Sequence, residues 1–178
     1  MRWRRGVTTA VVTLILLFVV RTVLYYSSDN NGELQTVTID MTQPFFAVYF
    51  GSPDATTLLP EFHQGIGTIE ERLTILLEGP RLEGLAPVVP EDTQLLGFSL
   101  VDDVLYLNFS HHLVTNHPGG SSGELITVYG IVNTVIGARG VMRVQILVDG
   151  RQVPTLVGHL DLSEPLEKDY ELLGGSQI

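Results

Sequence analysis

An uncharged apolar stretch near the start of the chain constrains its architecture more than any other sequence feature. Residues 6–20 contain no charged side chain, and three arginines precede them. Extended to Tyr26, the stretch has 21 residues, which as a helix would span about 30 Å, the thickness of the hydrocarbon core of a bilayer. Because positive residues favour the cytoplasmic side, we expect residues 1–5 to be cytoplasmic and residues 6–26 to form a transmembrane signal-anchor helix. The rest of the chain would then be extracytoplasmic at the cell membrane.

Two other interpretations of this stretch remain open. A cleaved secretory signal is one, because the apolar run from Val7 to Val20 also fits such a peptide, although Leu24–Ser28 shows no small-x-small cleavage site. A buried core helix is the other, and the arginine flank argues against it. The sequence contains no cysteine, so we expect no lipid-modified cysteine, disulfide or thiolate metal site.

The charge of the chain limits its partners. It carries 10 basic and 20 acidic residues, for a formal net charge of −10. An acidic surface repels phosphate, which excludes nucleic acid and disfavours docking on anionic lipid headgroups. Apolar residues make up 44% of the chain, enough for the core of one domain. Apolar surfaces or basic protein surfaces are therefore the expected partners.

Alternation of apolar and polar residues predicts several strands. The expected strands are residues 45–50, 95–101, 104–109, 141–149 and a short one at 156–160. The second and third form a hairpin that turns at Asp102 and Asp103. Two other segments have the spacing of amphipathic helices. A capping box at Thr68–Glu71 precedes the first helix, and a second box at Ser121–Glu124 precedes a helix that extends to Val135.

This order predicts the fold class. Strand, helix, strand, strand, helix, strand indicates an α+β domain, a small, mostly antiparallel sheet with the two helices packed on one face. We expect a polar linker over residues 27–35, the domain over residues 36–160, and an acidic flexible tail over residues 161–178.

Several short motifs, in this order, resemble the GerMN domain family. They are Leu-Leu-Glu-Gly-Pro at 76–80, Asn-Phe-Ser at 108–110, Asn-Thr at 133–134 and Val-Asp-Gly at 148–150. The resemblance covers roughly residues 69–151. The residues that carry it are Leu76, Leu77, Gly79, Pro80, Pro90, Ser110, Glu124, Asn133, Thr134, Asp149 and Gly150.

The resemblance implies a non-enzymatic role in assembling protein complexes of the bacterial envelope during sporulation or germination. It implies helices over a small sheet, similar to the ring-building modules of secretion-type machines. Envelope proteins or further copies of the chain are the expected partners, with no cofactor, metal, catalytic residue or small-molecule substrate. The chain shows one such domain where the namesake of the family has a tandem pair. An accessory or ligand-binding domain near cell-wall polymer is the alternative.

Two groups of residues suggest other chemistry. Ser121 lies in a Gly-x-Ser-x-Gly sequence, but no strand leads into it, so an extracytoplasmic hydrolase using Ser121 and His117 is the weakest hypothesis. His111, His112 and His117 are close in sequence, but their spacing is not that of a zinc site, and a polar surface loop explains them.

Two further patterns have structural interpretations. Gly65 and Gly67 precede a helix and could bind an anion, but Glu70 and Glu71 in the first turn would repel phosphate. Asp102 and Asp103 form a carboxylate pair that suits a hairpin turn. We therefore expect no catalytic site.

Overall fold

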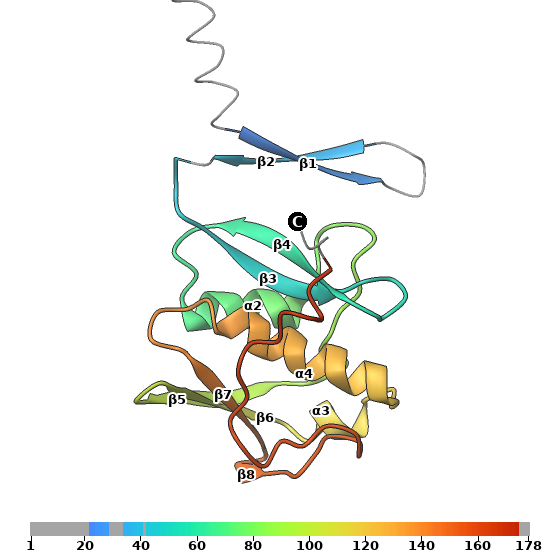
Figure 1. Cartoon of the computed structure of the whole chain (residues 1–178), viewed down its shortest axis with the longest axis vertical. Coiled ribbons are helices and arrows are strands. Elements are labelled where there is room, and N and C mark those ends of the chain that lie inside the picture. The colour runs from blue at the N-terminus through green and yellow to red at the C-terminus, as the bar shows by residue number, and fades with distance from the viewer. Residues whose placement is uncertain (1–21, 29–33, 41, 175–178) are drawn as a thin grey trace, which may run out of the picture.

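Two helices lie between two β-sheets, and a further β-hairpin follows the N-terminal residues (Figure 1). The computed structural model describes residues 22–28, 34–40 and 42–174. In chain order, the elements are β1 (Thr22–Ser28), β2 (Leu34–Asp40), β3 (Phe45–Gly51), β4 (Leu58–Gln64), α2 (Ile69–Glu78), β5 (Leu95–Val101), β6 (Val104–Phe109), α3 (His112–Thr115), α4 (Ser121–Val135), β7 (Arg143–Val148) and β8 (Arg151–Gln152).

The described strands form three sheets. β1 pairs antiparallel with β2, and β3 pairs antiparallel with β4. The third sheet has the order β5-β6-β7-β8. Within it β6 and β7 run parallel, joined through α3 and α4, and the other two pairs are antiparallel.

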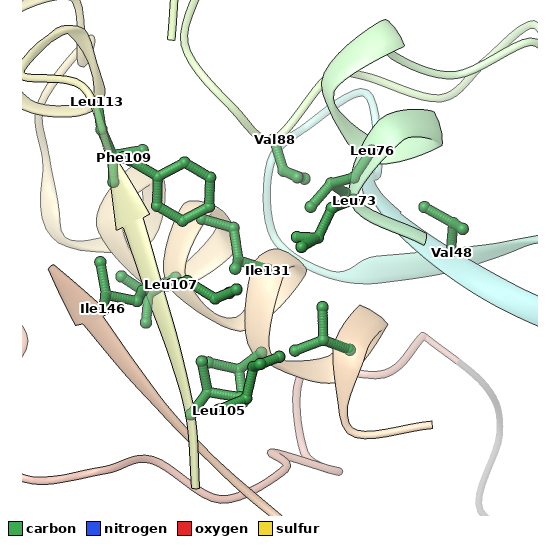
Figure 2. Packing of buried hydrophobic residues seen from close by; sticks show 14 of the residues in the cluster. Val48, Leu73, Leu76, Val88, Leu105, Leu107, Phe109, Leu113, Ile131 and Ile146 are labelled. Carbon is green, nitrogen blue, oxygen red and sulfur yellow. The ribbon is translucent and has the colours of Figure 1, made fainter. Parts of the chain in front are cut away.

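The core lies on both sides of the helix layer. Figure 2 shows the buried side chains of β6 against Ile131 of α4, with Leu73 and Leu76 of α2 and Val48 of β3 beyond it. α4 is buried at nearly every position from Glu124 to Val135, because sheets cover both of its sides. The spacing of apolar residues predicted one buried face on this helix, whereas most of its surface is buried.

The α+β class and the mostly antiparallel pairing are confirmed, but the arrangement of layers differs from the expectation. The helices do not cover one face of one sheet, because β4 joins β3 in a second sheet on their other side. The sequence pattern did not predict β4, which reads Leu-Leu-Pro-Glu-Phe-His-Gln. Pro60 and the buried Glu61 break the alternation of apolar and polar residues that indicates a strand.

The two predicted capping boxes have different outcomes. At α2 the box is present, because the Thr68 hydroxyl accepts from the Glu71 N–H at 3.2 Å and the Glu71 carboxylate accepts from the Thr68 N–H at 2.8 Å. At α4 it is absent. Gly120 occupies the N-cap position and no side chain caps the helix, so the prediction for Ser121 is wrong.

The N-terminal predictions are partly overturned. Thr22–Ser28 is a strand, so residues 22–26 are not part of the helix expected over residues 6–26. The ends of the expected linker, residues 27–28 and 34–35, belong to β1 and β2. Residues 1–21 and 29–33 lie outside the described residues. In the part of the chain that is described, no helix has the length and apolar character needed to cross a bilayer.

The C-terminal segment, residues 161–174, packs on the domain and is not a flexible tail. Leu162 is buried, and Leu166 exchanges two backbone hydrogen bonds of 2.8 Å with Val144 of β7. The Leu58 N–H of β4 donates to Leu172 O of this segment at 2.7 Å. Irregularly spaced leucines carry no periodic signal, so the sequence pattern missed this packing. Residues 156–160 form no strand either.

Candidate functional site

Glu124 is the motif residue whose side chain accepts the most hydrogen bonds. It is fully buried in the first turn of α4, where its carboxylate accepts hydrogen bonds from the 155–159 loop. The donors are Thr155 Oγ1 and the N–H groups of Leu156 at 2.8 Å, Val157 at 3.1 Å and His159 at 2.7 Å. Burial alone would raise the pKa of Glu124, but these hydrogen bonds outweigh it and leave the pKa below its ordinary value.

Asn133 and Thr134 bind other segments from the C-terminal half of α4. The Asn133 side chain donates to Asp169 O at 2.7 Å and accepts from Asp169 N at 3.0 Å. One side-chain amide thus bonds both the C=O and the N–H of Asp169 in the C-terminal segment. Thr134 Oγ1 accepts from Tyr49 N of β3 at 2.9 Å. Both residues are buried. These two side chains therefore hold β3 and the C-terminal segment against the same helix.

Arg72 of α2 was not among the sequence candidates, yet it connects three elements. Its buried guanidinium donates to Gly67 O at 2.7 Å, Ala47 O at 3.0 Å and Thr134 O at 2.8 Å. It also lies over the Phe46 ring, 4.9 Å from the ring centroid. Burial lowers the pKa of Arg72 from its ordinary value. An arginine on the predicted buried side of a helix, one position before Leu73, was the signal available in the sequence.

The strand ends that carry Ser110, Asp149 and Gly150 are linked by side-chain hydrogen bonds. Ser110 Oγ accepts from Gln94 N at 3.0 Å and so fixes the approach to β5. Gly150 N donates to Asn108 Oδ1 at 2.6 Å. Asp149 and Gly150 both have positive φ, 47° and 75°, the geometry of a two-residue hairpin turn between β7 and β8.

The motif at the end of α2 shapes the connection to β5. Leu76 is buried and Leu77 packs on the core, and Gly79, with φ 88°, ends the helix before Pro80. Glu61 of β4 then accepts from the N–H groups of Arg81 and Leu82, both at 2.8 Å. Pro90 lies farther along, beside a hollow of about 290 Å³ between the 87–91 segment and α4.

Ser121 and His117 do not form a nucleophile and base pair. His117 Nδ1 accepts from Gly119 N at 2.9 Å, and His117 Nε2 lies 3.1 Å from Thr127 Oγ1, which donates to Val88 O at 2.7 Å. Both ring nitrogens are thus engaged away from Ser121, and Thr127 accepts the Nε2 proton. Burial lowers the pKa of His117, which favours this neutral form.

The histidine cluster does not converge on a metal position. The rings of His111 and His112 are in contact, tilted by 33° with centroids 4.1 Å apart, whereas His117 is directed to Thr127. His111 Nδ1 lies 3.5 Å from Asp149 Oδ2, with both side chains mostly exposed. In the described residues, no three histidine, aspartate or glutamate side chains are placed to share a metal ion.

The remaining sequence candidates have local structural roles. Gly67 accepts from Arg72 through its carbonyl, and the Phe46 ring covers the place where a Cβ would lie. Asp102, with φ 55°, forms the β5–β6 turn. Asp103 binds Arg143 through two hydrogen bonds, the shorter of 2.8 Å, and the Arg143 hydrogen bond lowers the pKa of this carboxyl.

Comparison with known proteins agrees with this fold. The model of the Germane family, described as sporulation and spore germination, matches residues 23–154, well over half of the chain. The chain belongs to the Germane family. This result confirms the resemblance to GerMN domains and extends it toward the N-terminus, into β1. No curated protein matches the sequence significantly.

Two solved structures share the fold of this Germane domain. One is a candidate lipoprotein from Clostridium perfringens, with TM-score 0.53 and 23% identity, covering 83% of this chain and 85% of that one. The other is the tandem GerMN domains of the sporulation protein GerM from Bacillus subtilis, with TM-score 0.58 and 19% identity. The match covers 79% of this chain and 52% of the GerM chain, as one domain matched against a pair would.

Proposed function

We propose that this chain is a non-enzymatic protein-interaction module that helps to assemble a complex of the cell envelope during sporulation or germination. Its Germane domain would lie outside the cytoplasm, held at the cell membrane by the apolar residues 6–20. Membership of a family described as sporulation and spore germination is the observation that carries this proposal.

The use of the motif side chains supports a role in binding over one in catalysis. Glu124, Asn133, Thr134 and Ser110 are buried and hold backbone groups of other segments. A nucleophile or general base must instead keep a polar atom free to meet a substrate. These residues shape and stabilise a domain whose surface would make the functional contacts.

The neighbours support the proposed location. One is a candidate lipoprotein and the other a sporulation protein, and the charge-free run at residues 6–20 offers a different means of attachment from a lipid-modified cysteine. The acidic charge of the chain favours contacts with apolar surfaces or basic proteins.

The test uses the full chain, tagged at its C-terminus, in the cells that encode it. We expect it in the membrane fraction, with the domain sensitive to protease added outside the cytoplasmic membrane. Photo-cross-linking from exposed positions is expected to join it to envelope proteins in sporulating cells. Recovery of the chain from the cytosol, or normal spore formation and germination after deletion of its gene, would contradict the proposal.

A separate measurement addresses catalysis. We expect a fluorophosphonate probe to leave the purified full chain unlabelled, with the Ser121→Ala variant indistinguishable from the wild type. Stoichiometric labelling that depends on Ser121 would favour the hydrolase hypothesis instead.

A further inference from the structure

The four-stranded sheet has one covered edge and one open edge. On the β7 side, β8 pairs with Leu147 and Val148, and Leu166 pairs with Val144. On the other side β5 is the terminal strand. Within the described residues, the backbone of β5 hydrogen-bonds to β6 and no segment pairs with its outer edge.

The open edge lacks the charged residues and the proline that often block strand addition, and its register shift lies between Leu95 and Gly97, before the regular pairing of residues 97–101 with β6. β5 reads Leu-Leu-Gly-Phe-Ser-Leu-Val, without a charged residue or proline. Its apolar side chains are partly in water, with 51% of Leu96, 38% of Phe98, 39% of Leu100 and 54% of Val101 exposed. Edge strands usually carry lysine, proline or an inward-pointing charge, because a bare apolar edge recruits other chains.

The register shows how an added strand would pack. Phe98 is paired with Leu107, and Leu100 with Leu105, and both leucines of β6 are fully buried. Paired residues of antiparallel strands lie on the same face of a sheet. Phe98 and Leu100 thus continue the core face of the sheet past its covered part. A strand hydrogen-bonded to β5 would place alternate side chains over them.

The charges at the two ends of β5 indicate what kind of strand fits. Glu91 and Asp92 precede the strand and are exposed, and the exposed Asp102 follows it. The neighbouring Asp103 is paired with Arg143. Beside a second copy of β5, antiparallel or parallel, one of these acidic ends would meet another, and the net charge of −10 adds further repulsion.

We propose that β5 accepts a β-strand from a partner protein, with alternating apolar residues and a lysine or arginine at both ends. Backbone hydrogen bonds would supply affinity, and Phe98 and Leu100 with the acidic ends would supply specificity. This inference rests on the proposed function and specifies the surface and the partner chemistry of that interaction.

The direct test measures binding of a labelled peptide to the purified full chain by fluorescence anisotropy. The probe has the core Val-Thr-Val-Thr-Val with two lysines at each end, and the matched peptide has glutamates in their place. We expect the lysine peptide to bind about tenfold more tightly at low salt, since several exposed ion pairs add modest terms. The difference is expected to shrink in high salt. Equal binding of both peptides, or no binding, would overturn the proposal.

Variants locate the contact. Asp92→Asn with Asp102→Asn is expected to reduce the preference for lysine, with Glu91 left in place, and asparagine tolerates the positive φ of both positions, 62° and 55°. Phe98→Thr with Leu100→Thr is expected to weaken the lysine peptide about tenfold, because threonine keeps strand propensity but lacks the apolar surface. Glu164→Gln, an exposed change on the segment that covers the opposite edge, serves as the matched control and is expected to change nothing.

Hydrogen exchange gives a readout that does not depend on affinity. Peptide binding is expected to slow amide exchange in residues 95–101 and not in β7 or β8. Slower exchange in other segments instead would overturn the proposal. So would a dimer, detected by sedimentation, in which β5 exchanges slowly without peptide, because a second copy of the chain would then be the occupant. Envelope cross-links that form only from positions away from β5 would support the proposed function and refute this inference. Peptide binding at β5 by a chain that is found in the cytosol would support this inference and refute the proposed function.

Discussion

Replacement of Glu124 by glutamine removes one negative charge from the centre of a buried network and changes little else in size. One carboxylate oxygen accepts from Thr155 Oγ1, Leu156 N and Val157 N, and the other accepts from His159 N. Of its two amide orientations, glutamine has the lower energy when its oxygen faces the three donors Thr155 Oγ1, Leu156 N and Val157 N. Its NH₂ group then faces the partly buried His159 N–H, so two donors meet with no acceptor between them.

The expected cost follows from this geometry. One charge-assisted hydrogen bond is lost, the other three are left with a neutral acceptor in place of a carboxylate, and the partly buried His159 N–H loses its partner. Together these terms predict that Glu124→Gln lowers the free energy of unfolding by about 2–4 kcal/mol. The exposed Glu70→Gln in the first turn of α2 is the control, with a change expected within about 0.5 kcal/mol.

The same substitution has a signature in pH. The pKa of Glu124 is lowered in the folded protein, so its contribution to stability is present above the unfolded pKa. It is lost as the pH falls below the ordinary glutamate pKa of about 4.3 toward the folded value. The stability difference between wild type and Glu124→Gln is therefore expected to be full at pH 7 and to narrow in acid.

Urea unfolding of the full chain at a series of pH values measures both quantities, and hydrogen exchange reports on residues 155–159 separately. We expect faster exchange in that loop for the variant. A stability difference below 1 kcal/mol at neutral pH, or one that does not change between pH 7 and pH 3, would refute the reasoning that a charged, fully bonded Glu124 holds the loop.

Three further substitutions test the other buried contacts. Arg72→Met leaves three carbonyl groups, two buried and one partly buried, without this donor and is expected to lower the free energy of unfolding by about 3 kcal/mol in urea titration. Asn133→Ala removes both bonds to Asp169, so amide exchange in residues 161–174 is expected to accelerate before that of the core, and uniform exchange would contradict this. Gly130→Ala places a Cβ 2.7 Å from Val88 Cγ2 and is expected to cost about 1–3 kcal/mol, part of which Val88→Ala in the same chain restores if the clash is the cause.

Features that depend on residues close together in the sequence were predictable. The Thr68–Glu71 capping box, the turn at Asp102 and the end of α2 at Gly79 all occur where expected. Each involves groups three or four residues apart, so the pattern itself contains both partners. The same rule failed at Ser121, because Glu124 finds better partners in a loop more than 30 residues away.

The order of most helices and strands, the acidic charge and the short motifs of the family were thus determined by the sequence alone. Only the tertiary structure decided that β4 closes a second sheet over the helices, that residues 161–174 pack on the domain, and that β5 keeps apolar side chains in water. The physical reason is that a sequence pattern specifies which side chains need to be covered, whereas the element that covers them depends on contacts between distant parts of the chain.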